Sequence, residues 1–228
     1  MKRFLLLATI SAISMVSFAQ ADSNWGANSK SKSSVSEGWS SFYVQYNPSK
    51  LVVDTSGDDD QSFTGITVGY NRDIGITYGT PIYLEVGVAA QYSFVKKDGY
   101  LFDDDDDYDF EMSWNMGSIK VPLSLTYDWE VSPAVSIAPY AGLTARFNIF
   151  GNMSAENDYD DKSVNIFDKK DMGSKEAVWK RFQIGWQIGV NLKFNETWYL
   201  GASYGTDFSE VCKKIKIAQP ALSIGFIF

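Results

Sequence analysis

An alternation of apolar and small or polar residues recurs along this sequence and continues to its last residue. In the final segment, Phe228, Phe226 and Ile224 share one side of an extended chain, whereas Gly225 and Ser223 share the other. Successive side chains of a β-strand point to opposite faces. The alternation therefore predicts strands that have one apolar face and one small or polar face.

Eight segments of the chain alternate in this way, and residues 181–194 do so most clearly. Their apolar positions are Phe182, Ile184, Trp186, Ile188, Val190, Leu192 and Phe194, and the positions between are Arg181, Gln183, Gly185, Gln187, Gly189, Asn191 and Lys193. The other segments fall within residues 42–46, 65–70, 82–91, 118–127, 135–148, 198–205 and the stretch that ends at Phe228. The sequence therefore predicts an all-β fold of eight strands.

The composition of the two faces decides between a soluble and a membrane barrel. Alternation alone also fits a soluble lipocalin-like barrel or a secreted sandwich, which turn their apolar face inward. Here the polar face is mainly Gly, Ser, Gln, Thr and Tyr, whereas a water-facing surface carries many Lys and Glu. A charge facing mid-bilayer lipid costs roughly 2–4 kcal/mol, and the apolar face is nearly free of charges. We therefore predict a closed eight-stranded antiparallel up-and-down transmembrane β-barrel.

The connections between the segments alternate in length. Short connections are expected at residues 71–80, 128–133 and 195–196, and longer ones at residues 48–61, 96–111, 150–178 and 206–216. Outer-membrane barrels combine short periplasmic turns with long extracellular loops. Five tryptophans lie near the ends of segments, where an interfacial position suits the indole ring: Trp39, Trp114, Trp129, Trp179 and Trp198.

The start of the chain has the pattern of a secretory signal. An apolar core at residues 4–18 follows a basic start and precedes the small-x-small site Ala19-Gln20-Ala21. We expect residues 1–21 to be a signal peptide, residues 22–37 to be a flexible periplasmic lead, and residues 38–228 to be one outer-membrane barrel domain. After the signal, no apolar run reaches the roughly eighteen residues of a transmembrane helix.

The chain resembles the small bacterial outer-membrane β-barrel family, which includes porin-family, opacity and OmpA-type transmembrane barrels. The resemblance covers roughly residues 37–228 and lies in the segments Lys120-Val121-Pro122-Leu123-Ser124-Leu125 and Tyr140-Ala141-Gly142-Leu143, together with the signal and the aromatic end. It implies the fold and leaves the function open. It also implies that Phe226 and Phe228 are an assembly signal, and that the partners are outer-membrane lipid, lipopolysaccharide and the assembly machinery.

Acidic residues gather in the predicted external loops. The longest run is Asp103, Asp104, Asp105, Asp106 and Asp107, with further acids at residues 58–60 and 158–161. Such oxygen ligands suit divalent cations, but the run lacks the glycine and the ligand spacing of an EF-hand loop. We expect solvated, self-repelling loops that bind divalent cations weakly, with no defined metal site and no cofactor. An extracellular ligand at these loops is the other expected partner.

Five charged residues fall on the polar face of the predicted strands: Glu85, Lys120, Arg146, Arg181 and Lys193. Unpaired charge is costly in a closed, low-dielectric interior. The expected arrangement is therefore a lumen plug, in which Glu85 pairs with Lys120. Loop carboxylates such as Asp158 or Asp171 are expected to meet the positive charges of Arg146 and Arg181. The alternative is a narrow, anion-preferring pore.

The chain contains no histidine, which removes the usual base of outer-membrane hydrolases and acyltransferases. We therefore predict no catalysis and no catalytic residue, and no basic, aromatic-interleaved patch indicates nucleic-acid binding. The leading hypothesis is a structural or surface-interaction role through the acidic external loops. The alternatives are a narrow porin-like channel for small solutes and a soluble exported lipocalin-like ligand carrier.

Overall fold

A computed structural model describes residues 38–53, 61–76, 80–101, 108–157, 160–168, 179–211 and 215–228, which form eleven strands. The strands are β1 Ser40–Tyr46, β2 Ser49–Val53, β3 Gln61–Gly75, β4 Ile82–Leu101, β5 Tyr108–Tyr127, β6 Trp129–Ser132, β7 Val135–Asn157, β8 Asp160–Asn165, β9 Phe182–Phe194, β10 Trp198–Asp207 and β11 Ile215–Ile227. None of the described residues belongs to a helix long and apolar enough to cross a membrane.

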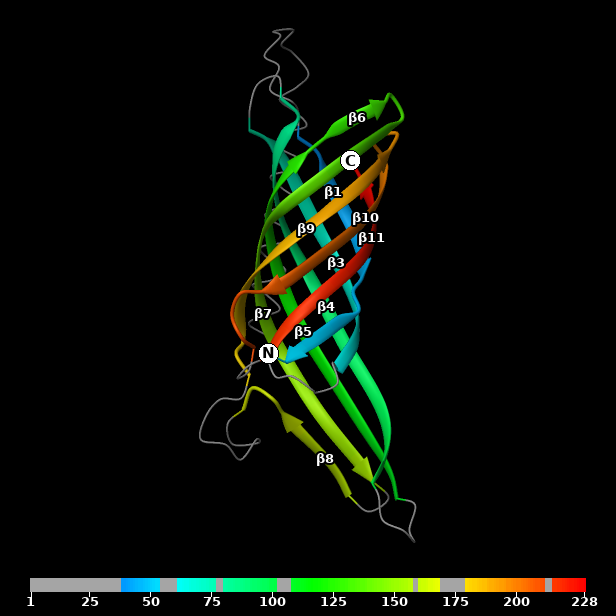
Figure 1. The fold of residues 1–228 in the computed structure, drawn as a ribbon, viewed down its shortest axis with the longest axis vertical. Helices are drawn as coiled ribbons and strands as arrows, with labels where there is room; N and C mark the ends of the chain where they lie inside the picture. Colours follow the sequence, from blue (N-terminus) through cyan, green and yellow to red (C-terminus); the bar gives the residue numbers. More distant parts are fainter. Residues whose placement is uncertain are drawn as a thin grey trace. The chain divides into compact units, whose positions relative to one another are not determined.

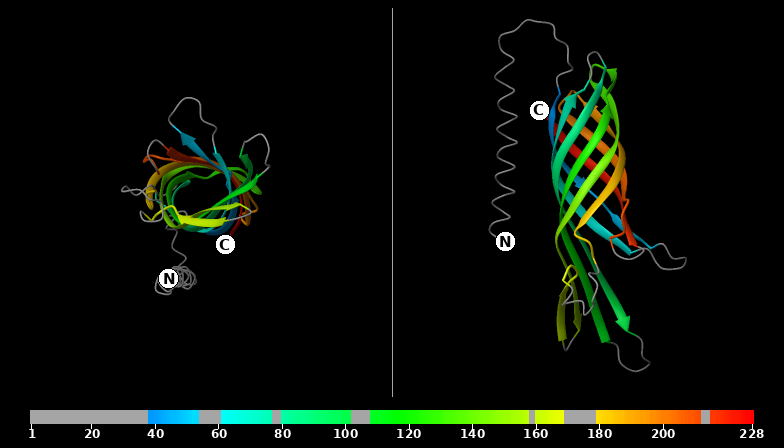
Figure 2. Two further views of the ribbon diagram at one scale, coloured as in Figure 1. Left: turned by 90° about the horizontal axis from the view of Figure 1, so that it is seen from below. Right: turned by 90° about the vertical axis from the view of Figure 1, so that its left-hand side faces the viewer.

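The strands close into a barrel, seen as a ring in the left view of Figure 2. Each of β3, β4, β5, β7, β9, β10 and β11 pairs antiparallel with its neighbour in that order, and β1 pairs with both β11 and β3 to close the ring. The strand β2 continues β1 against the same two neighbours. With β1 and β2 counted as one, the barrel wall consists of eight strands, which are called staves below. They confirm the predicted closed, antiparallel, up-and-down barrel.

The apolar face of the strands points outward. Large hydrophobic side chains on every stave are 38% to 63% exposed, among them Val68, Leu125, Ile188 and Leu222. The alternate positions are polar and buried inside, as Thr67 and Gln183 show, each at 0% exposure. This orientation confirms the membrane prediction and contradicts the lipocalin-like alternative, in which the apolar face lines the interior.

The two ends of the barrel differ in their connections, and Figure 1 shows both. At the end with the C-terminus, called the turn end here, three residues join Phe194 to its partner Trp198, and two of them, Asn195 and Glu196, have φ values of 50° and 52°. At the opposite end, called the loop end, β4, β5 and β7 continue past the other staves, and β8 pairs with β7.

The long strands correct part of the sequence prediction. Residues 96–111 were expected to be a loop, but β4 continues to Leu101 and β5 begins at Tyr108. Charged and polar residues occupy both odd and even positions of this stretch, so it shows no alternation that would predict a strand. Similarly, β3 continues to Gly75, where a turn from Asn71 onward was expected.

Candidate functional site

The loop end of the lumen is closed by an apolar cap. Its buried members are Phe63, Met116, Ile166, Trp179, Val211 and Ile217, and Val95, Trp114, Met153 and Phe167 pack against them. The Trp114 ring meets Phe63 and Trp179 edge to face, with centroids 4.9 Å apart in both pairs. Trp114 and Trp179 are therefore lumen residues, and their predicted interfacial position is wrong. Trp114 and Lys120 both occupy even positions of β5 and therefore face the same side of the strand. This pattern could have predicted that Trp114 faces the lumen.

A β-bulge brings β7 into the cap. Gly117 lies opposite Phe150 and Ser118 opposite Asn148, so Ile149 is an extra residue in β7. An extra residue shifts the phase of the side chains that follow it. Asn148 is buried before the bulge, and Gly151 is buried after it, where a methyl group would overlap Ile166. After the bulge, the odd-numbered residues of β7 therefore face the lumen, whereas the even-numbered residues do so before it.

Arg181 holds this bulge from the rim of the barrel. Its Nη1 donates to the carbonyl oxygens of Ile149 at 2.7 Å and Asn148 at 3.3 Å. Its guanidinium carbon lies 4.6 Å from the centroid of the Phe167 ring. Arg181 is exposed. Its predicted place within a lumen charge network is thus wrong, because β9 begins only at the next residue.

Below the cap, Arg146 is buried in an ion pair with Asp207. An Nη2–Oδ2 contact joins the two side chains, which are 3% and 9% exposed. Arg146 Nε also donates to Gln183 Oε1 at 3.1 Å. The partner of Arg146 is thus a β10 residue, which sequence reasoning missed because it ended that strand at Gly205. The loop carboxylates named for this role, Asp158 and Asp171, lie outside the described residues.

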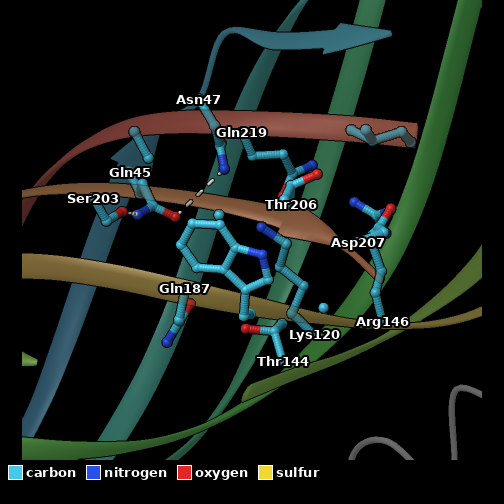
Figure 3. A pocket seen from close by; sticks show the side chains of 15 residues that line it. Gln45, Asn47, Lys120, Thr144, Arg146, Gln187, Ser203, Thr206, Asp207 and Gln219 are labelled. Carbon is cyan, nitrogen blue, oxygen red and sulfur yellow. Dashed lines mark hydrogen bonds and ion pairs between the residues drawn. The ribbon is translucent and has the colours of Figure 1, made fainter. Parts of the chain in front are cut away.

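Lys120 borders two small cavities, each of about 40 Å³. One of them, shown in Figure 3, gathers amide, hydroxyl and charged side chains from six staves. Glu85 lines the other. In the register of the barrel, Glu85 lies opposite Ser124 and Lys120 opposite Ala89. Glu85 and Lys120 therefore share a cavity, but they form no ion pair, and their predicted direct pairing is wrong.

Tyrosine side chains fill the middle of the lumen against cross-strand glycines. Tyr43 lies opposite Gly69, and Tyr199 lies opposite Gly225. A methyl group on either glycine would overlap the facing tyrosine ring. The glycines are therefore needed for the close approach of the rings, which an eight-stranded barrel requires because its interior has room for little else.

The turn end is closed by charged and aromatic groups. Lys193 Nζ lies 3.0 Å from Asp128 Oδ2 and 3.2 Å from the centroid of the Trp39 ring. Trp39 in turn packs on Tyr83, with centroids 4.2 Å apart. Asp73 is a further buried carboxylate of the lumen, at 2% exposure. Sequence reasoning missed Asp73 and Asp128 because it assigned both to turns.

The C-terminal residues close the barrel seam. Ser40 and Phe228 exchange both backbone hydrogen bonds, at 3.1 Å and 2.9 Å. The Phe228 ring stacks on Phe42 at 5.3 Å, and Phe226 meets Trp198 at 5.0 Å. Both terminal phenylalanines are exposed on the outside of the barrel, at 40% for Phe226 and 54% for Phe228.

Several predicted features lie outside the described residues. They are the signal peptide at 1–21, the lead at 22–37 and the acidic run Asp103 to Asp107. Within the described ranges, no three His, Cys, Asp or Glu residues are grouped so that they could hold a metal ion.

The family of the chain follows from comparison with known proteins. The family model described as "Outer membrane protein beta-barrel domain" matches residues 18–210. Among solved structures, Ail of Yersinia pestis, crystallised with the heparin analogue sucrose octasulfate, is 16% identical over 84% of this chain and 99% of its own, with a TM-score of 0.39.

Two further solved structures are similar to this chain. Neisserial surface protein A is 12% identical over 83% of this chain and 97% of its own, with a TM-score of 0.42. The outer membrane enzyme PagL is 10% identical over 79% of this chain and 97% of its own, with a TM-score of 0.43. No curated protein sequence matches. The chain therefore belongs to the outer membrane β-barrel proteins and is located in the bacterial outer membrane.

Proposed function

We propose that this barrel is a sealed membrane anchor, without catalysis, which presents β-structure and acidic loops at the cell surface. The observation that carries the proposal is the double closure of the lumen. The apolar cap fills the loop end, and the Lys193–Asp128 pair over Trp39 closes the lumen at the turn end, where these residues line a cavity of about 400 Å³. Short turns are periplasmic in this class of barrel, so the loop end faces outward.

The sealed lumen favours an anchor over a channel. Side chains fill an eight-stranded barrel, and hydrophobic constrictions exclude water and ions. Val211 and Ile166, in the cap, are 0% and 1% exposed. The polar lining around Arg146 and Lys120 favours the narrow channel, our second candidate, but conduction would require the cap to move.

The loop end supports a surface-interaction role. Backbone pairs continue outward to Leu101–Tyr108 between β4 and β5, and to Asn157–Asp160 between β7 and β8. Among the described strands, β8 pairs only with β7. An edge of this kind offers unpaired backbone groups to an extended partner. The acidic run Asp103 to Asp107 adds weak divalent-cation binding to the proposal.

The remaining parts of the proposal rest on residue chemistry. The sequence has no histidine, which supports a non-catalytic barrel. The exposed aromatic Phe228 completes the seam, which supports its use, with Phe226, as an assembly signal. Outer-membrane lipid and lipopolysaccharide are the partners of the outward apolar face.

Single-channel recording tests the sealed lumen. The refolded chain in a planar lipid bilayer should give no discrete current steps. The matched variant Trp114→Ala, which removes the central ring of the cap, should give steps or a higher leak. Steady current steps from the unaltered chain would overturn the sealed anchor and establish the channel.

A further inference from the structure

Two prolines face each other across the closing seam of the barrel. Tyr46 lies opposite Leu222 and Lys50 opposite Ala218, so the register of β11 against β1 and β2 runs through without a shift. This register places Pro48 opposite Pro220. The stretch that contains Pro48 is also where strand structure is interrupted between β1 and β2.

The proline pair removes two backbone hydrogen bonds from the seam. Ser40 and Phe228 exchange both of their bonds, and hydrogen-bonded pairs alternate along an antiparallel ladder. Every second pair from there is of the same kind, and Pro48–Pro220 is one of them. Proline has no N–H group, so neither residue can donate to the other. The seam is therefore weakest at this point.

The weak point lies at the outer boundary of the apolar band. On the outward face of the two strands, Tyr46 and Leu222 are exposed on the side toward the turn end, at 50% and 63%. Lys50 and Lys216 are exposed on the side toward the loop end. Apolar residues suit lipid and lysines suit the headgroup region. The prolines thus lie where the membrane meets water.

A polar cavity of about 40 Å³ lies directly behind the prolines. Its lining includes Asn47, which precedes Pro48, and Gln219 and Ala221, which flank Pro220. Figure 3 shows Gln45, Asn47 and Gln219 gathered with Lys120 around this cavity. A cavity needs roughly 10–15 Å³ of this kind to hold one water molecule. At about 40 Å³ the cavity exceeds this minimum, so it has room for a halide-sized ion.

The cavity is lined by two cations, Lys120 and Arg146, and by one carboxylate, Asp207, which attracts both of them. Asp207 is engaged by Arg146. Lys120 forms no ion pair or hydrogen bond with any described residue. The amides add spare donors, since within the described chain the Gln45 side-chain nitrogen donates only to Ser203 and that of Asn47 only to Gln45. A cation inside the barrel that is not ion-paired is costly, and a counter-ion relieves that cost.

We propose that this cavity is a binding site for a small monovalent inorganic anion of halide size, which enters laterally through the Pro48–Pro220 seam. The Lys120 ammonium group supplies the charge, and the amides of Gln45 and Asn47 complete the donors. The apolar cap closes the direct path from the loop end, so the proline seam is the shorter route from the headgroup region.

Bromide tests the site in crystals. Crystals of the refolded chain grown in bromide should show an anomalous peak in the cavity beside Lys120. Lys120→Met keeps most of the unbranched side chain, removes its charge, and should abolish the peak. Lys50→Met removes an exposed lysine near the same seam and should leave the peak in place. Absence of the peak from the unaltered chain, or its persistence in Lys120→Met, would overturn the site.

Solution measurements separate a specific site from binding at crystal concentrations. At constant ionic strength, chloride in place of gluconate should raise the unfolding midpoint and saturate. Lys120→Met should weaken this chloride response about tenfold or more, because it removes a charge-assisted hydrogen bond. A linear response, equal in both chains, would mean an adventitious ion only.

The lateral route has its own test. Pro48→Ala with Pro220→Ala restores two N–H donors in the seam. Bromide release, followed by halide exchange, should then slow while affinity stays the same, because the site itself is intact. Release at the original rate would show that the anion does not pass through the seam and would overturn the lateral route.

Discussion

The two ends of the lumen are closed by different chemistry. At the loop end, the cap is apolar and draws Ile166, Trp179 and Val211 from segments between strands. At the turn end, Lys193 and Asp128 are joined by an ion pair over an aromatic ring. Long connections can fold side chains back into the barrel, whereas turns of a few residues cannot. The turn end must therefore be closed mainly by the staves themselves and the residues beside them.

This contrast has an energetic consequence. Inward positions of the staves near the turn end carry charged and hydrogen-bonding groups, and burying these is tolerable only when they are paired. The buried members of the apolar cap carry no charge, and they meet one another through apolar and aromatic contacts. The cap should therefore respond to lost volume, and the turn end to lost charge.

The largest effect is expected from Trp114→Ala. Trp114 contacts both Phe63 and Trp179. Removing a large ring from a packed core costs about 3–5 kcal/mol. Urea unfolding in lipid vesicles would measure this loss. Trp114→Phe retains an aromatic ring and should lose much less. Equal losses in the two variants would mean that the cap is not held by packing.

A smaller loss is expected from Lys193→Met at the turn end. The substitution leaves Asp128 without its partner, and that side chain is 21% exposed. The cost should be about 2–3 kcal/mol, below the 3–5 kcal/mol of a fully buried pair, because water reaches the carboxylate. The same unfolding assay measures it.

Adding Asp128→Asn to Lys193→Met should recover part of that loss, since no uncompensated charge remains. If the stability losses of the two substitutions simply add, the turn end is held by packing, and the proposed contrast between the two ends fails.

The strands, the faces and the closure of the barrel were predictable from sequence. Away from the bulge in β7, alternation predicts which face of its strand a residue occupies. Val68 lies outside and Gln183 inside, as their positions in the alternation predict. The odd or even position of a residue does not predict its height along the barrel axis, because no local sequence pattern indicates the stagger between neighbouring strands. Glu85 and Lys120 therefore share a face and a cavity, but four residues of register separate them from a direct pair.

The cap and the ion-pair partners were not predictable for a related reason. Ile166 and Val211 lie in connections without periodicity, so nothing in their neighbourhood indicates burial. Asp207 and Asp73 occupy the next inward-facing positions of their strands, beyond the ends that the sequence predicted for these strands. The alternation fades where a strand leaves the apolar band, and the last polar residues were assigned to loops.

A modest gain in stability is expected from Pro48→Ala with Pro220→Ala, which lie between the two closures. Each restored backbone bond adds about 0.5–1.5 kcal/mol. Each lost proline returns about 0.4–1 kcal/mol of entropy to the unfolded chain. The net gain should be about 1 kcal/mol in the unfolding assay. Pro133→Ala, in the turn between β6 and β7, is the control and should give no gain. A destabilised double variant would contradict the register of the seam.

The smallest effect is expected from Arg181→Met at the rim. Arg181 contacts the bulge carbonyls of Asn148 and Ile149 and the ring of Phe167. Exposed contacts of this kind contribute about 0.5–1 kcal/mol, because water competes for the guanidinium group. Global stability should therefore change little.

The informative measurement for Arg181→Met is local hydrogen exchange. The amides of residues 148–151 should exchange faster, since the bulge loses its clamp, while the amides around Lys193 should not change. Lys180→Met, an exposed neighbour, is the matched control and should leave both regions as they are. Faster exchange at the turn end as well would show that the two closures are coupled through the barrel wall. In that case the two closures would form one cooperative plug, and the apolar cap could no longer be treated as separate from the charged turn end.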